Sequence, residues 1–469
     1  MIGALSGLYT DMYQLTMAQA YVRDGTAEAP AVFDYFFRRA PFGGGFALFA
    51  GLEDLLEFLD GFRFSADDLD YLATLGLSAA LLERLRGFRF RGAILSAREG
   101  EVVFPLEPVA RVEAALLEAQ LVETALLNFL NFETLIATKA ARLRLAAGQR
   151  LLSEFGLRRS QGLGGVHASR AAVIGGCDTT SNVYAARRFG LRPAGTMAHS
   201  YIESHASEIE AFRSFAASHP DGCMLLVDTY DTLRSGMPNA VRTAKEMEAR
   251  GERLYAVRLD SGDLAYLAKQ ARRMLDEAGL GYVRIVASNL LDENVIRSLL
   301  DQGAPIDLFG VGTKLATGAP DAALDGVYKL AAAGGEPRLK LSENLVKTTL
   351  PGRKAVLRCS DPDLAFRADA VVLEEEKEVP RMVHPFEPGK SLGLSDLKQE
   401  PILVKVMENG RRLRPPAPVA DIAAYARERL ARLPDEHKRF ENPHIYKVGL
   451  SERLAALRDG LVRRHREEA

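Results

Sequence analysis

Short apolar runs alternate with amphipathic stretches through the middle of the chain, from about residue 150 to about residue 330. A polar or glycine-containing cluster follows each run, and the runs recur roughly every 20–30 residues, close to the length of one strand–helix unit. They are uniformly apolar, as is typical of strands buried on both faces of a parallel sheet. The runs are LLSEF (151–155), AVIGG (172–176), GTMAH (195–199), CMLLVD (223–228), LYAVRLD (254–260), VRIVAS (283–288), IDLFGVG (306–312) and VYKL (327–330).

The stretch after Asp263 shows the helical period clearly. Apolar or small residues fall at positions 264, 267, 268, 271, 274, 275 and 278, which form one helical stripe. Asp263 is the expected N-cap and Gly279 the expected stop. Seven or eight such units predict an α/β fold built on an incomplete (β/α) barrel. A doubly wound open sheet is the alternative, since periodicity does not distinguish a closed sheet from an open one.

The flanks have a different character. Residues 1–130 mix helices with short strands, and residues 335–410 are β-rich with turn residues and proline between the runs. We interpret 1–130, completed by 335–410, as one discontinuous N-terminal α/β domain beside a barrel domain at 131–334. Residues 411–469 form a C-terminal helical segment, and its basic end (RDGLVRRHREEA) is typical of a solvated helix.

Charge and composition exclude several classes of protein. The chain has 60 Lys and Arg against 62 Asp and Glu, a net charge of −2, so it has no general attraction to nucleic acid or to an anionic membrane. Glu118 and Glu123 interrupt the most apolar stretch, and no membrane span is predicted. The three cysteines contain no Cys-x-x-Cys pair, which argues against zinc and disulfides and suits the cytoplasm. No signal-peptide pattern opens the chain.

Reactive side chains follow the predicted strands. The carboxyl ends of parallel strands share one face of a barrel, and active sites are built on that face. One polar residue there is usually a surface or capping residue, whereas His, Asp and Arg on successive strand ends indicate a site. The candidates are Glu154, Arg158, Arg159, Asp178, Thr179, Thr180, Thr196, His199, Asp228, Asp231, Arg258, Asp260, Asp263, Ser288, Asn289, Gly310, Gly312, Thr313 and Lys314.

Three of these segments suggest specific chemistry. FGVGTKLATG (309–318) combines two glycines with Thr313 and Lys314, which fits phosphate binding after the seventh strand; the alternative is glycine kept for packing. His199 ends an apolar run before acidic strand ends, which suits a general base or a phosphoryl acceptor, unless it is structural. Arg258 and Asp260 face the same side, where Arg258 suits a carboxylate or phosphate and Asp260 suits ribose hydroxyls or Mg²⁺-bound diphosphate. The alternative is an Arg–Asp pair that closes the barrel.

Nine segments in order resemble the nicotinate phosphoribosyltransferase family over nearly the whole chain. They are TDMYQLTMAQAY (10–21), FFRRAPFGGGFALFAGL (36–52), EFGLRRSQG (154–162), IGGCDTTSN (174–182), GTMAHSY (195–201), VDTYDTLRSG (227–236), VRLDSGDL (257–264), FGVGTKLATG (309–318) and KTTLPGRKAVLR (347–358). This resemblance implies ATP-dependent transfer of phosphoribose from 5-phosphoribosyl 1-diphosphate to nicotinate. The products are nicotinate mononucleotide and diphosphate, in NAD salvage by the Preiss-Handler pathway.

The resemblance also implies the site. A catalytic role falls on His199, Asp228 and Asp260, with His199 as the phosphorylated histidine. Nicotinate contacts fall on Tyr13, Phe155, Thr196 and Arg258, and phosphoribosyl diphosphate contacts on Arg158, Asp228, Asp260, Gly312 and Thr313. ATP is the co-substrate and Mg²⁺ accompanies the diphosphate, with no other metal. The implied assembly is a cytoplasmic homodimer with shared active sites, in which Tyr13 reaches the partner's site.

The chain departs from the family pattern at 163–165, where LGG stands in place of a polar pair, and it lacks the Cys-rich segment of some members. Tyr13-Gln14 stands where the nicotinamide enzyme has Tyr-Lys, which favours the acid over the amide. A nicotinamide or quinolinate phosphoribosyltransferase remains an alternative. Two alternatives come from other classes of protein. One is a barrel lyase of aldolase type, with Lys314 or Lys329 as the Schiff-base lysine. The other is an inactive barrel that acts as a ligand sensor.

Overall fold

The computed structural model describes residues 5–342, 348–387 and 389–467, so Lys347, the first residue of the KTTLPGRKAVLR segment, lies outside it. The chain forms two compact units. Unit 1 comprises Met1–Thr138, Ala323–Ala417 and Ala424–Ala469, and unit 2 comprises Lys139–Ala322 and Pro418–Ala423. The fold is mixed α/β, and the helix α6 (Glu123–Ala147) begins in unit 1 and ends in unit 2. Among the described residues, no helix is both long and apolar enough to cross a membrane.

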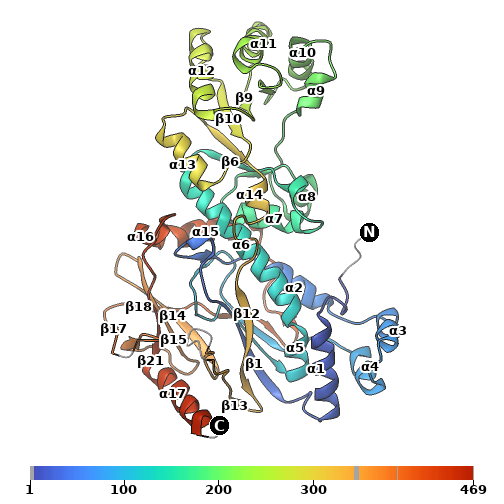
Figure 1. Ribbon diagram of the computed structural model, residues 1–469, viewed down its shortest axis with the longest axis vertical. Helices are drawn as coiled ribbons and strands as arrows, with labels where there is room; N and C mark the ends of the chain where they lie inside the picture. Colours follow the sequence, from blue (N-terminus) through green and yellow to red (C-terminus); the bar gives the residue numbers. More distant parts are fainter. Residues whose placement is uncertain (1–4, 343–347, 388, 468–469) are drawn as a thin grey trace. The chain divides into compact units, whose positions relative to one another are not determined.

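A seven-stranded sheet is the centre of unit 1. Its order is β13-β12-β1-β5-β3-β19-β20, with antiparallel pairs throughout. Its strands are β1 (Pro30–Phe37), β3 (Ala93–Ser96), β5 (Ala110–Ala115), β12 (Gly326–Ala333), β13 (Glu336–Pro337), β19 (Val404–Glu408) and β20 (Arg411–Arg412). Its buried apolar residues pack with those of the neighbouring helices, and α1 and α5 lie side by side (Figure 1). These helices are α1 (Met12–Arg23), α2 (Leu52–Gly61), α3 (Ala66–Thr74), α4 (Ala79–Arg86) and α5 (Leu116–Leu121).

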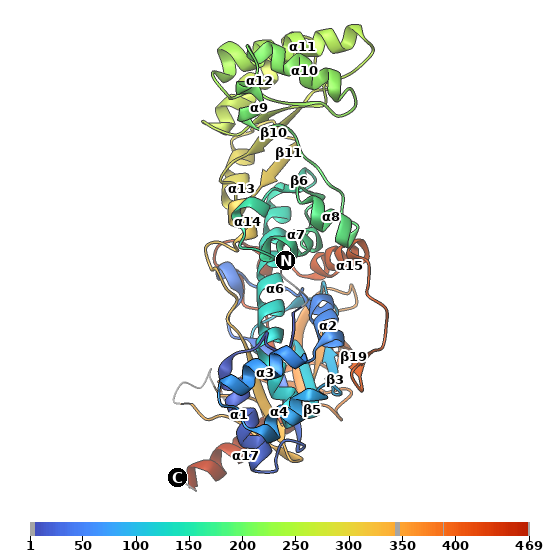
Figure 2. The ribbon, with the colours of Figure 1, turned by 90° about the vertical axis from the view of Figure 1, so that its right-hand side faces the viewer.

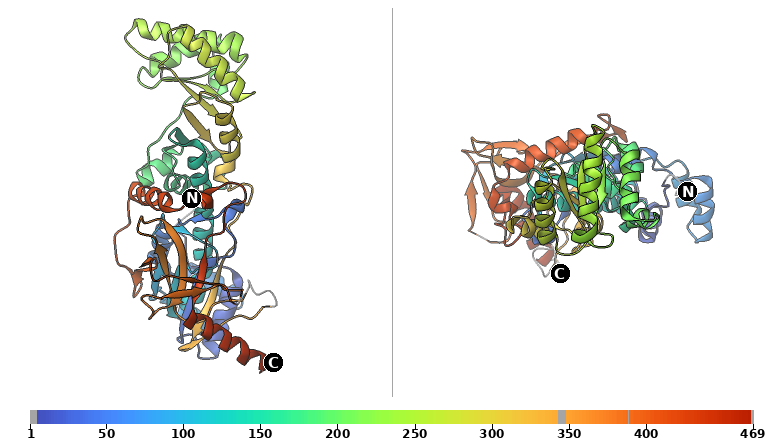
Figure 3. Two further views of the ribbon diagram at one scale, coloured as in Figure 1. Left: turned by 90° about the vertical axis from the view of Figure 1, so that its left-hand side faces the viewer. Right: turned by 90° about the horizontal axis from the view of Figure 1, so that it is seen from above.

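A second, six-stranded sheet of unit 1 has the order β17-β16-β21-β15-β14-β18. It consists of β14 (Lys354–Ser360), β15 (Phe366–Leu373), β16 (Arg381–Val383), β17 (Ser391–Gly393), β18 (Lys398–Pro401) and β21 (Val448–Ser451). The C-terminal helix α17 (Glu452–Glu467) packs against β15, β16 and β21 (Figure 3). Further elements are a β2 (Ala47–Leu48) and β4 (Val102–Val103) pair, α16 (Asp435–Lys438), and α15 (Val419–Arg432), which begins in unit 2 and ends in unit 1.

Buried charges join the strands of unit 1. Arg358 is fully buried and donates to Asp369 at 2.6 and 3.0 Å and to Glu101 at 2.6 Å. Glu107 lies beside this group and accepts from the Phe104 amide at 2.9 Å. Burial, together with the Asp369 carboxylate, holds the pKa of Glu107 well above its usual range.

The parallel sheet of unit 2 has the order β7-β6-β11-β10-β9-β8. Its strands are β6 (Leu151–Glu154), β7 (Thr179–Thr180), β8 (Met224–Leu226), β9 (Ala256–Leu259), β10 (Arg284–Ser288) and β11 (Leu308–Val311). The helices are α7 (Gly164–Ile174), α8 (Val183–Phe189), α9 (His199–Glu203), α10 (Glu208–Ser218), α11 (Met237–Ala249), α12 (Leu264–Glu277), α13 (Glu293–Asp301) and α14 (Thr313–Ala316). α11 lies between α10 and α12, and α12 packs on β9 and β10 (Figure 2).

Five of the predicted runs form strands of this parallel sheet: β6, β8, β9, β10 and β11. The predicted helix after Asp263 is also confirmed. The Asp263 side chain accepts from the Tyr266 amide at 3.0 Å, and Gly279 follows the helix with a left-handed φ of +71°. These elements could be predicted from the sequence because each combines a hydrophobic pattern with residues that locally start or stop an element.

Two predicted strands are wrong, and a third is a strand of another sheet. AVIGG (172–176) lies at the end of α7, because a five-residue apolar run suits a buried helix as well as a strand. GTMAH (195–199) forms no strand: 195–198 are irregular and His199 begins α9, so His199 is not at a strand end as predicted. VYKL (327–330) is a strand, but it lies in β12 and pairs antiparallel with β1 in unit 1. Tyr328 is the buried residue of this run, and four residues do not reveal whether the neighbouring strand is parallel or antiparallel.

Candidate active site

The carboxyl ends of the unit 2 strands bring most of the candidate residues together. Parallel pairing puts these ends on the same edge of the sheet. Phe155 follows β6, Asp228 follows β8 by one residue, and Asp260 follows β9. Ser288 ends β10, and Gly312 follows β11. The residues are far apart in the sequence, so only the sheet makes them neighbours.

Arg258, Asp260 and Ser288 form a closed hydrogen-bonded group. Arg258 Nε donates to Ser288 Oγ at 2.9 Å, and Arg258 Nη2 donates to Asp260 Oδ1 at 2.7 Å. The Ser288 hydroxyl donates to the same Asp260 oxygen. Burial opposes ionisation of Asp260, but the Ser288 hydrogen bond and the Arg258 charge outweigh it and lower the pKa of the carboxyl. Asp260 is therefore ionised at neutral pH. Arg258 is only 9% exposed, and its hydrogen bonds to Ser288 and Asp260 fix the orientation of its guanidinium.

Asp228 supports the Asp260 backbone with one oxygen. Its Oδ2 accepts from the Asp260 amide at 2.8 Å and from the Ser261 hydroxyl at 2.6 Å. Its Oδ1 is buried and has no hydrogen-bond partner among the described residues. A buried acceptor without a partner is costly to the fold and is therefore suited to a ligand hydroxyl or a cation.

His199 lies beside this group although it is not on a strand. Its Nδ1 lies 3.1 Å from the Thr229 hydroxyl, and its Nε2 lies 3.8 Å from Asp260 Oδ2. Its side chain is 41% exposed, so reagents can reach the ring. Thr229 and Ser261 were not identified from the sequence; their signal was their place directly after Asp228 and Asp260.

Phe155 occupies space that two glycines leave open. A Cβ at Gly310 would lie 2.6 Å from Phe155 Cε2, and one at Gly312 would lie 3.0 Å from the Phe155 carbonyl oxygen. The Arg258 guanidinium lies over the Phe155 ring, 5.9 Å from its centroid. The buried Glu154 accepts from the Gly156 amide and from the Ser169 and Thr180 hydroxyls, which holds the turn around Phe155.

The glycine loop after β11 differs from the predicted phosphate site in one respect. Lys314 pairs with Asp292, whose Oδ1 caps α13 by accepting from the Asn294 and Val295 amides at 3.0 and 2.8 Å. The Lys314 ammonium therefore holds the loop to α13. Thr313 is exposed and starts α14. Lys329 lies in β12 of unit 1, so neither lysine is placed as a Schiff-base residue of the parallel sheet would be.

Three further predicted residues have less defined surroundings. Arg158 is exposed in the turn Leu157–Arg159, where its Nη1 donates to the Phe155 carbonyl at 3.4 Å. The Thr196 hydroxyl donates to the Met224 carbonyl at 2.9 Å, which leaves it only an acceptor role toward a ligand. Tyr13 belongs to unit 1, where it is 48% exposed near the start of α1.

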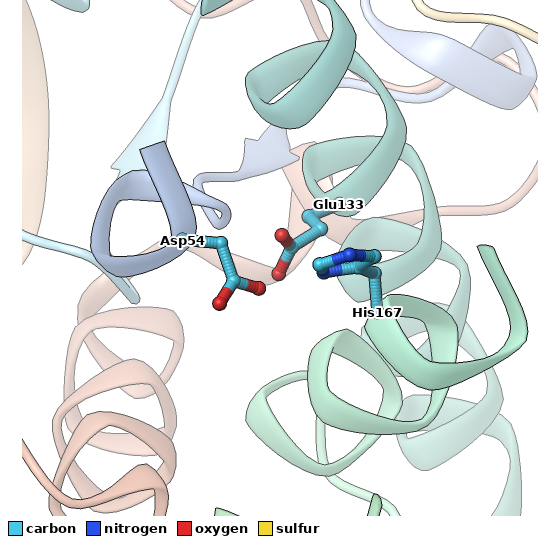
Figure 4. A group of neighbouring side chains, drawn as sticks. All are labelled: Asp54, Glu133 and His167. Atoms are coloured by element: carbon cyan, nitrogen blue, oxygen red, sulfur yellow. The ribbon is translucent and has the colours of Figure 1, made fainter. Parts of the chain in front are cut away.

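Other polar features of unit 1 are separate from this group. Asp54 on α2 and Glu133 on α6 point their carboxylates toward each other (Figure 4), while His167, labelled in the same view, belongs to unit 2. Unit 1 also contains a cavity of about 1020 Å³, whose wall includes Asp34 and Lys354. Lys329, the alternative Schiff-base lysine, also lines it, whereas the residues predicted for the transferase site do not.

Comparison with known proteins gives a consistent result. Models described as the nicotinate phosphoribosyltransferase N-terminal domain, family and C-terminal domain match residues 8–131, 151–376 and 353–458. Nicotinate phosphoribosyltransferase of Bacillus subtilis (strain 168) is 45% identical over 460 residues, covering 95% of this chain and 93% of that protein. The Homo sapiens protein of the same name is 37% identical over 517 residues, covering 97% and 96%.

Solved structures agree with the sequence relatives. The crystal structure of human nicotinic acid phosphoribosyltransferase superimposes with a TM-score of 0.87 at 35% identity, covering 96% of this chain and 99% of that one. The structure of nicotinate-nucleotide pyrophosphorylase from Pyrococcus furiosus gives a TM-score of 0.72 at 25% identity, covering 91% and 95%. The similarity therefore extends over both units.

Proposed function

The chain belongs to the nicotinate phosphoribosyltransferase family, and on that premise we propose a role for each residue of the site in transferring phosphoribose from 5-phosphoribosyl 1-diphosphate to nicotinate. The products are nicotinate mononucleotide and diphosphate, and the reaction serves NAD salvage. The observation that carries the assignment is the buried group of Arg258, Asp260 and Ser288 beside the ring of Phe155. It combines a cation for a carboxylate, an aromatic face for a pyridine ring and an ionised carboxylate for the sugar.

Nicotinate binds through its ring and its carboxylate in this proposal. Phe155 stacks on the pyridine, and the Arg258 guanidinium, 5.9 Å from the centroid of the Phe155 ring, is placed to meet the carboxylate. Thr196 contributes its methyl group, because its hydroxyl hydrogen is donated to the Met224 carbonyl. Tyr13 of a second chain covers the other face of the pyridine, which makes the active unit a homodimer with shared sites. The exposure of Tyr13 supports this role, because a ring that is 48% exposed is available for contact.

The phosphoribosyl group binds at the acidic side of the site. Asp228 Oδ1 has no hydrogen-bond partner among the described residues, and Asp260 Oδ2 lies 3.8 Å from His199 Nε2; both oxygens can accept from ribose hydroxyls. Gly312 and Thr313 offer backbone and hydroxyl donors to the phosphate, and the exposed Arg158 meets the departing diphosphate. Mg²⁺ bound to the diphosphate would neutralise its charge, and the same carboxylate oxygens fit its preference for oxygen ligands.

The chemistry then depends on alignment. Positive charge builds on the ribose as the C1–diphosphate bond breaks, and the nearby carboxylates stabilise it. The pyridine nitrogen, held on Phe155, attacks C1 from the side opposite the leaving group. Orientation of this kind contributes roughly 7–11 kcal/mol at best to lowering a barrier.

His199 is the proposed acceptor of the ATP γ-phosphoryl group. Its exposed ring and its contacts with Thr229 and Asp260 support this role, because a hydroxyl fixes one nitrogen and leaves the other accessible. Phosphorylation would add negative charge beside Asp260 and so reorganise the site.

Two structural proposals accompany this function. We infer that the unit 2 sheet is an incomplete (β/α) barrel. The strand order supports this inference, because strands that are consecutive in the chain are neighbours in the sheet and the last strand, β11, pairs with the first, β6. In the strand order of this sheet, β7 and β8 are the two edges, so the ring is open between them. The three buried, free cysteines support a cytoplasmic location.

The test is mass detection of nicotinate mononucleotide and diphosphate, with and without ATP, using nicotinate, nicotinamide or quinolinate as the acceptor. We expect product from nicotinate and stimulation by ATP. Asp228→Asn should lower kcat/KM by about 10–100-fold, since it removes charged hydrogen bonds. Asp276→Asn is the matched control, because Asp276 is an exposed carboxylate of α12 paired only on the surface with Arg272. Absence of nicotinate mononucleotide under all conditions would exclude the assignment.

A further inference from the structure

The guanidinium of Arg258 has two edges that can bind an oxygen pair, and the protein occupies one of them. The side edge consists of Nε–H and one N–H of Nη2. Ser288 Oγ accepts from Nε at 2.9 Å and Asp260 Oδ1 accepts from Nη2 at 2.7 Å. The Ser288 hydroxyl closes the ring by donating to the same Asp260 oxygen. The side edge is therefore fully used.

The end edge consists of the remaining N–H of Nη2 and one N–H of Nη1. Among the described residues, Nη1 donates to the Met197 carbonyl at a long 3.4 Å. A guanidinium held along its side edge cannot turn without breaking both short bonds. The end edge can therefore bind a ligand carboxylate through two parallel hydrogen bonds.

We propose that Ser288 is the positioning residue that holds Arg258 in this orientation and thereby sets the preference for a carboxylate-bearing pyridine. The inference rests on the function proposed above and deepens it, because it concerns how the same site tells the acid from the amide. Ser288 contacts Arg258 and Asp260, and its effect on the ligand is transmitted through them.

A serine is well suited to this position for two reasons. Its hydroxyl accepts from Nε–H and donates to a carboxylate at the same time, which neither alanine nor glycine can do. It is also small and 2% exposed at the end of β10, where it follows Ala287, the partner of Leu259 in β9, and pairs with Gly310 of β11. Gly310 is the residue that makes room for Phe155, so Ser288 lies between the residues for the carboxylate and the ring.

Removing the hydroxyl has a specific expected effect. In Ser288→Ala, Nε–H loses its acceptor, and the guanidinium is free to bind the two Asp260 oxygens in its place. The end edge then turns away from the ligand. We expect the KM for nicotinate to rise about tenfold, since a charged hydrogen bond is lost or misdirected. The apparent affinity for nicotinamide, measured as turnover or as competitive inhibition, should change less than about threefold, because an amide makes no charged pair with Arg258.

Two further variants make the test decisive. Ser153→Ala removes another buried serine hydroxyl from the same sheet, one that bonds to Thr179 at 2.6 Å, and should leave the acid–amide preference unchanged. Ser288→Thr keeps the hydroxyl and should restore most of the nicotinate affinity. Thermal melting of all the variants shows whether each is folded.

The outcomes separate the inference from the proposed function. A selective loss of nicotinate affinity in Ser288→Ala, recovered in Ser288→Thr, supports the inference. Wild-type protein that makes nicotinate mononucleotide, together with an unchanged preference in Ser288→Ala, overturns it while the proposed function stands. An equal loss with both pyridines also overturns it, because that result indicates a merely structural serine. If the wild type makes no nicotinate mononucleotide, the proposed function fails and the inference with it.

Discussion

Gly310 offers a direct test of whether the Phe155 ring binds the substrate. A Cβ at position 310 would lie 2.6 and 2.7 Å from Phe155 Cε2 and Cδ2, whereas carbon atoms in contact are usually about 3.5–4.0 Å apart. Gly310→Ala therefore requires the ring to move by about 1 Å. Gly310 lies within β11 between two strands, so the ring has more freedom to shift than the backbone does.

The size of the effect follows from that displacement. A misplacement of about 1 Å in a group that positions a reactant costs about 10²-fold in rate, or about 2.7 kcal/mol of transition-state stabilisation. Overpacking also costs about 1–3 kcal/mol of folding stability. We therefore expect the kcat/KM for nicotinate to fall about 100-fold in Gly310→Ala, with a protein that still folds.

A double-mutant cycle with Phe155→Ala isolates this cause. Without the ring the new methyl group has nothing to displace, so Gly310→Ala should cost less than about threefold in the Phe155→Ala background. Gly281→Ala is the control, because its Cβ would have an ordinary 3.7 Å contact with Asp276. Steady-state kinetics and thermal melting of the five proteins complete the assay. Activity of Gly310→Ala within twofold of wild type, or an equal loss with and without the ring, would refute the reasoning.

Three further predictions concern the rest of the protein. His199→Ala should abolish the acid-labile label from γ-labelled ATP and the stimulation by ATP, and equal labelling of wild type and variant would exclude His199 as the acceptor. Mixing inactive Tyr13→Ala and His199→Ala chains should restore some activity, because a heterodimer contains one intact shared site; no recovery after proven subunit exchange would contradict that site. The raised pKa of Glu107 means that its stabilising protonated form is lost as pH rises through that pKa. Glu107→Gln should therefore melt higher than wild type at pH 8, with a smaller difference at pH 5; a lower melting point at pH 8 would contradict it.

The helix after Asp263 and five of the parallel strands were predicted from the sequence because their signals are local. A capping aspartate, a 3.6-residue period and a terminal glycine act within one element. The strand ends also identified Asp228, Arg258 and Asp260 as candidate residues. Short apolar runs were less reliable: AVIGG is the end of a helix and VYKL belongs to the antiparallel sheet. A run of five apolar residues is equally compatible with a buried helix, a parallel strand and an antiparallel strand.

The sequence by itself determined which side chains are available, and its resemblance to a family indicated the chemistry. The tertiary structure decided which of them act together and which are already engaged. Lys314 looks like a phosphate ligand in the sequence, yet its charge pairs with Asp292 on α13. Ser288 looks like any small residue at the end of a strand, yet it joins Arg258 to Asp260. The reason is physical: hydrogen bonds and ion pairs depend on distances of about 3 Å, and residues 30 positions apart reach such distances only when the strands pair.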